Sequence, residues 1–106
     1  MKQDALPVTD PLGHDIFLVS DVQQGFTGTR TEHTEDDVLN VVRKPAFLVS
    51  LQNGAEKLFY FRSIDWHNTL LLEVAFHHNR WEAIEATWNP ASEVLANLLK
   101  KGKKLL

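Results

Sequence analysis

Any catalysis by this chain has to use histidine, carboxylate, arginine and hydroxyl side chains, because its 106 residues include five His but no Cys. The lack of Cys also excludes a disulfide framework, a thiolate metal site and a Cys nucleophile. Several candidate side chains recur at the alternating spacing that places residues on one face of a sheet. Such a face carries carboxylates, a guanidinium that can bind phosphate, and aromatic rings that can stack on bases. Its members would be Tyr60, Arg62, Glu73, Trp81, Glu85 and Thr87.

Four predicted strands between about Ala46 and Trp88 have to position this face. Apolar residues alternate along each of them, and Asn53-Gly54 between the first two is a strong hairpin signal. We therefore expect a four-stranded antiparallel meander with one strongly apolar face. The assignment assumes strands without bulges, because a slip of one residue moves every later side chain to the other face.

The meander is flanked by an early strand at residues 14–20 and by two helices. A short helix is expected after Thr34, which can serve as its N-cap, and it should end before Pro45. A C-terminal helix is expected to begin at Asn89-Pro90, with Asn89 as N-cap, and to stop at Gly102.

The elements predict one α+β domain over residues 14–106, with both helices on the apolar face of the sheet. Residues 1–13 are Pro-rich and polar, and we expect them to form a flexible N-terminal arm.

The charge excludes a chain that binds nucleic acid through its overall field, since the net charge is −3. This charge is uneven: residues 1–56 carry a net −5, and residues 57–106 carry a net +2. No apolar run reaches the length of a membrane span, and the first residues lack the apolar core of a signal peptide. We therefore expect a soluble, cytoplasmic protein that does not enter a membrane.

Five segments follow one another in a suggestive order: Thr31-Glu32-His33, DVLNVVRKP, KLFYFRSI, LLLEVAF and WEAIEATWNP. Together they place a His before a helix that ends near Pro, then an aromatic–basic strand, an apolar strand and a strand that ends in Thr. This order resembles the small toxin-like RNases of the barnase–EndoU–colicin–RelE superfamily, and its phage-associated branch most of all. The resemblance covers about residues 14–104 and consists of loose motifs.

The resemblance implies metal-free cleavage of RNA, in which the 2′-hydroxyl attacks the adjacent phosphate and leaves a cyclic phosphate. By position, His33 would be the acid–base group, and Arg30 or Arg62 would hold the phosphate. Thr87 would donate a hydrogen bond to the phosphate, and Glu85 would serve as base. RNA would be the partner, and no cofactor or metal would be required.

Each of these residues also has an ordinary structural interpretation. Tyr60 and Trp81 would form a base-stacking platform for the substrate, or they would be half-buried aromatic residues. Arg62 would bind phosphate, or it would pair with an acidic residue on a neighbouring strand. His77 and His78 are neighbours in a turn, so we expect their side chains to diverge and no metal site to form.

Two further functions stay open beside the endoribonuclease. One is a non-catalytic protein-binding module of the immunity or antitoxin type, which the acidic first half and the aromatic residues favour. The other is a small α+β ligand-binding domain.

Overall fold

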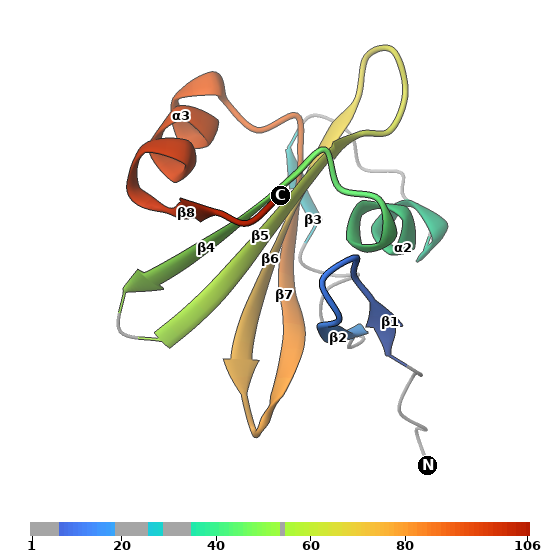
Figure 1. Ribbon diagram of the computed structural model, residues 1–106. Helices are drawn as coiled ribbons and strands as arrows, with labels where there is room; N and C mark the ends of the chain where they lie inside the picture. The colour runs from blue at the N-terminus through green and yellow to red at the C-terminus, as the bar shows by residue number, and fades with distance from the viewer. Residues whose placement is uncertain (1–6, 19–25, 29–34, 54) are drawn as a thin grey trace.

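The centre of the structure is a curled sheet of eight strands, shown in Figure 1. The computed structural model describes residues 7–18, 26–28, 35–53 and 55–106. Four long strands follow one another as antiparallel neighbours: β4 (Phe47–Asn53), β5 (Ala55–Ser63), β6 (Thr69–His77) and β7 (Arg80–Trp88). The short strand β8 (Lys103–Lys104) pairs with β4 at one edge.

On the other side of β7 the sheet becomes mixed. Both β2 (Asp15–Leu18) and β3 (Phe26–Gly28) run parallel to β7, with β2 beside its first half and β3 beside its second half. The strand β1 (Val8–Thr9) pairs antiparallel with β2, and Val8 is buried in the core. The α+β class is confirmed, but the sheet is larger than a four-stranded meander and is not purely antiparallel. The residues that form β1 lie within the stretch expected to be an N-terminal arm.

The two helices of the described chain pack on opposite faces of the sheet, as Figure 1 shows. The apolar stripe of α2 (Glu35–Arg43) belongs to the main core, where Val38, Val41 and Val42 meet Tyr60, Leu70 and Leu72. In contrast, α3 (Ser92–Lys101) buries Leu98 in a smaller cluster with Phe59 and Leu71.

The expectation that both helices cover one face is therefore wrong. The physical reason lies in consecutive apolar residues such as Leu70-Leu71-Leu72, which present apolar side chains to both faces of a strand. Within the described residues, neither helix is long and apolar enough to cross a membrane.

A β-bulge in β7 rearranges the predicted faces. Glu85 is opposite Glu73, but the next pair is Ala83 with Val74, so Ile84 is an extra residue in the strand. Because the bulge reverses the alternation, Trp81 lies on the α2 face although Glu85 lies on the α3 face. The two residues were expected to share a face, and that expectation is wrong.

The helix α3 begins later than its sequence suggests. Ala91 is its N-cap, and Asn89 instead has a left-handed backbone with φ 52°. The helix ends at Gly102, as predicted, where the backbone N–H donates to the carbonyl of Leu98 at 2.8 Å. A side chain at Gly102 would overlap Val49 Cγ1, so the close approach of helix and sheet requires glycine.

Candidate functional site

The structure separates the described residues of the predicted nuclease site. The Tyr60 side chain is fully buried under α2, and Trp81 is half-buried against the same core. The Arg62 guanidinium donates from Nη1 to the backbone carbonyl of Lys44 at 2.6 Å, so it holds the end of α2.

The strand register places Glu85 and Thr87 on the opposite face of the sheet from Arg62. Arg62 is opposite Leu70 in the main core, whereas Thr87 is opposite Leu71, which packs near α3. Glu85 shares the face of Thr87. The described candidates therefore lie on two faces and do not line one cleft. Arg30 and His33 lie outside the described residues.

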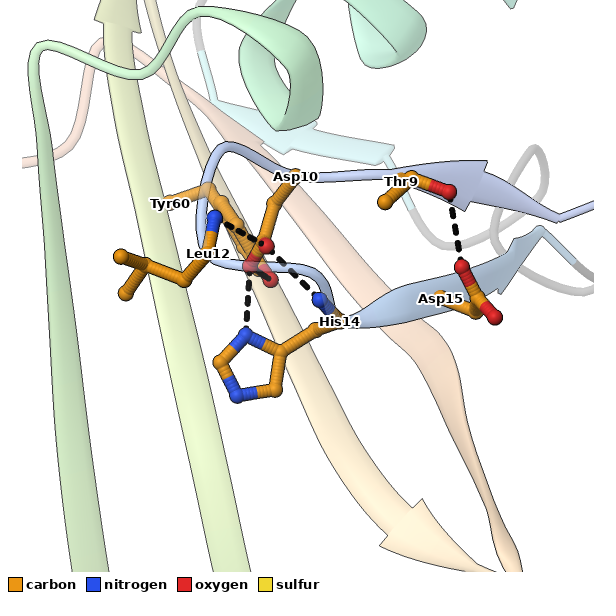
Figure 2. A network of polar contacts seen from close by, with 6 residues as sticks. All are labelled: Thr9, Asp10, Leu12, His14, Asp15 and Tyr60. Atoms are coloured by element: carbon orange, nitrogen blue, oxygen red, sulfur yellow. Dashed lines mark hydrogen bonds and ion pairs between the residues drawn. The ribbon is translucent and has the colours of Figure 1, made fainter.

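Tyr60 instead belongs to a polar network that Figure 2 shows. Its hydroxyl donates to the Asp10 carboxylate at 2.6 Å. The same carboxylate accepts the backbone N–H groups of Leu12 and His14, each at 2.9 Å. The Nδ1 atom of His14 lies 2.8 Å from Asp10 Oδ2, and the Asp10 side chain is fully buried. The network therefore links the β1–β2 turn to the central strand β5.

Hydrogen bonding keeps this buried carboxylate ionised. Burial alone raises the pKa of Asp10, but the hydrogen bonds from Tyr60 and His14 outweigh burial and lower the pKa below its ordinary value. Burial, together with the Asp10 charge, raises the pKa of Tyr60, so its hydroxyl stays a neutral donor. A buried Tyr that donates to a carboxylate cannot stack on a nucleic-acid base, and the network is a structural anchor.

A different feature, the loop between β5 and β6, exposes the most prominent apolar side chain of the described surface. Trp66 at its tip is 96% exposed. The loop projects beyond the helices in Figure 1, where it is the yellow turn between β5 and β6.

Hydrogen bonds hold the backbone around Trp66. The Asp65 carboxylate accepts the N–H of His67 at 3.0 Å and the Asn68 side-chain amide at 2.9 and 3.1 Å. The backbone carbonyl of Asn68 accepts the N–H of Ile64 at 2.8 Å, which closes the loop. This arrangement is an Asx-type turn, and it presents the indole from a defined backbone.

Asn89 joins the same loop to the segment that leads into α3. Its side-chain Oδ1 accepts the N–H of Thr69 at 2.8 Å, and its Nδ2 donates to Asn68 Oδ1 at 3.2 Å. The left-handed conformation of Asn89 allows these contacts. By residue type alone, residues 65–68 predict only a turn. A bulky aromatic residue inside a turn signal was the clue to an exposed anchor.

The hairpin between β6 and β7 contains the one group of described residues with ligand atoms spaced for a metal ion: His77, His78 and Glu82. Their donor atoms lie within 4.8 Å of one another. The His77 and His78 rings have centroids 4.1 Å apart, so the expected divergence of these side chains is wrong.

Comparison with known proteins does not place this chain in a family. The sequence matches no protein-family model, and no curated protein and no solved structure is significantly similar to it.

Proposed function

We propose that this protein is a non-catalytic protein-binding module whose contact surface is centred on Trp66. The observation that supports this function is the 96% exposure of an indole on a loop whose backbone is held by hydrogen bonds. Large exposed aromatic residues are uncommon on soluble domains, but they are enriched where one protein anchors itself in a pocket of another.

The energetics favour such a role. Transfer of a Trp side chain of roughly 200 Å² from water to an apolar pocket contributes about 5 kcal/mol before the costs of association. Because Asp65 and Asn68 already order the loop, little backbone entropy is lost when a partner binds. We therefore expect Trp66 to be a binding hot spot.

Charge favours a protein partner over RNA at this loop. Residues 64–68 contain no Lys or Arg to hold phosphate, and they include Asp65. The net charge of −5 over residues 1–56 suits a basic partner protein with an apolar pocket, as expected if this chain is a module of the immunity or antitoxin type.

The test compares Trp66→Ala with Leu99→Ala, a control at an apolar α3 residue that is 47% exposed. Tagged wild-type protein is used to isolate a partner from its native host, and the purified partner is then titrated against each variant. We expect Trp66→Ala to weaken binding at least about 30-fold, a loss of roughly 2 kcal/mol, and Leu99→Ala to leave it unchanged. Equal affinities for wild type and Trp66→Ala would overturn the proposal.

The endoribonuclease stays a second prediction, since Arg30 and His33 lie outside the described residues. Expression of the chain without a partner separates the two functions. Growth arrest with RNA cleavage, relieved by His33→Ala but not by Trp66→Ala, would favour the nuclease over the binding module. Normal growth and intact RNA would remove the nuclease.

A further inference from the structure

The β6–β7 turn has a backbone that brings two histidines together. His77 is opposite Arg80, so the hairpin has a two-residue loop of His78 and Asn79. Both loop residues have positive φ, 55° and 64°, as a type I′ turn requires. In an extended strand, neighbouring side chains point to opposite faces, but the left-handed backbone at His78 changes its direction. The two imidazoles therefore lie side by side.

Glu82 supplies a carboxylate to the same cluster from the neighbouring strand. Its Oε1 lies 2.8 Å from His77 Nδ1, and its Oε2 accepts from Arg80 Nε at 2.7 Å. The Arg80 guanidinium also lies over the Phe17 ring, 4.5 Å from its centroid. Arg80 thus holds one carboxylate oxygen and leaves the other directed at His77.

Exposure makes the cluster accessible from one side. The Glu82 side chain is only 11% exposed, whereas that of His77 is 53% exposed. His77 and Arg80 each contact one oxygen of the Glu82 carboxylate, which fixes its position at the base of the cluster. A buried anion at the base and two exposed imidazoles at the rim are the components of a cation site.

We propose that His77, His78 and Glu82 bind a first-row transition-metal ion such as Zn²⁺. Two imidazoles and one carboxylate suit zinc, copper or nickel, whereas calcium and magnesium prefer oxygen ligands throughout. The metal takes the place of the hydrogen bond between His77 Nδ1 and Glu82 Oε1, and the neutral His77 ring then carries its proton on Nε2. Three protein ligands leave a fourth position for water or another donor.

The required movement is small. Donor atoms around a tetrahedral zinc ion lie roughly 3.3 Å apart, because each metal–ligand bond is about 2.0 to 2.1 Å. The observed donors lie within 4.8 Å, and rotation of the exposed His78 side chain can close the difference of about 1.5 Å.

This inference is independent of the proposed protein-binding function. Trp66 precedes β6 and His77 ends it, so the two features lie at opposite ends of a nine-residue strand. Loss of either function leaves the other testable.

The experiment titrates ZnCl₂ into the full chain by isothermal calorimetry and follows the imidazole resonances by NMR. The test variant is His78→Asn, because Asn tolerates positive φ and preserves the turn. The control is His67→Asn, which removes an exposed His from the other loop.

We expect one Zn²⁺ per chain, with affinity at least tenfold lower in His78→Asn and unchanged in His67→Asn. The His77 and His78 resonances should move together, whereas that of His14 should not. Absence of binding by the wild type, equal affinity in His78→Asn, or loss of affinity in His67→Asn would overturn the proposal.

Discussion

Tyr60→Phe tests whether the Asp10 network anchors the fold. The substitution keeps the buried ring and removes only the hydroxyl that donates to Asp10 at 2.6 Å. A hydrogen bond to a charged group contributes about 1.5 to 3 kcal/mol. Three other donor contacts to the carboxylate remain, from Leu12 N, His14 N and His14 Nδ1, so Asp10 stays partly satisfied. We expect the free energy of unfolding to fall by about 2 kcal/mol at pH 7.

The effect should depend on pH in a defined direction. The pKa of Asp10 is lowered in the folded state, so its contribution is present above the unfolded value of about 3.9 and disappears as pH falls through the folded pKa. Without the hydrogen bond from the Tyr60 hydroxyl, the folded pKa of Asp10 should be higher than in the wild type. The difference between wild type and Tyr60→Phe should therefore shrink as pH falls through the folded pKa values of Asp10, because Asp10 becomes protonated first in the variant and at lower pH in the wild type.

Urea unfolding followed by tryptophan fluorescence, repeated between pH 3 and pH 7, measures both quantities. Thr9→Val is the matched control, since it removes the exposed bond from Thr9 Oγ1 to Asp15 Oδ1 in the same view of Figure 2. The control should change stability by less than about 0.5 kcal/mol. An equally small change in Tyr60→Phe, or a loss of stability that does not vary with pH, would show that the Asp10 network does not anchor the fold.

Other substitutions test the hairpins and the helix end by the same urea unfolding. Gly102→Ala should cost about 1 to 3 kcal/mol, because its Cβ would overlap Val49 Cγ1 and lie 2.8 Å from the Leu98 carbonyl; wild-type stability would contradict the packing. Glu82→Gln should cost at least about 1 kcal/mol at pH 7 and less in acid, since the lowered pKa of Glu82 stabilises the fold only above its unfolded value. Asn89→Gly retains positive φ but loses the acceptor for the Thr69 N–H, so it should cost about 1 kcal/mol, and Asn89→Ala should cost more because alanine disfavours that φ.

Local patterns predicted where most elements lie. The helix that ends at Arg43 stops before Pro45, because proline disfavours the helical conformation of the residue before it. The helix that ends at Lys101 stops at Gly102, because glycine readily adopts the backbone conformations that end a helix. The hairpin signal at Asn53-Gly54 likewise begins at the last residue of β4, which pairs antiparallel with β5. These effects act between residues that are close together in the chain, so the sequence is sufficient to predict them.

The candidate site was less predictable, because it depended on which face each side chain occupies. A single extra residue, Ile84, moved Trp81 away from Glu85, and no local pattern marks that bulge. The exposure of Trp66 was only partly predictable, since the sequence places an aromatic residue in a turn but does not show which neighbours cover it.

Residue types and their spacing were enough to predict the α+β class, the C-terminal ends of the two described helices and the lack of any thiol chemistry. Three other features required the folded structure: the helices occupy opposite faces, Asp10 is buried against Tyr60, and His77 and His78 lie together. The physical reason is the range of the interactions. Backbone preferences act over a few residues, whereas register, burial and side-chain direction follow from contacts between segments as far apart as Asp10 and Tyr60.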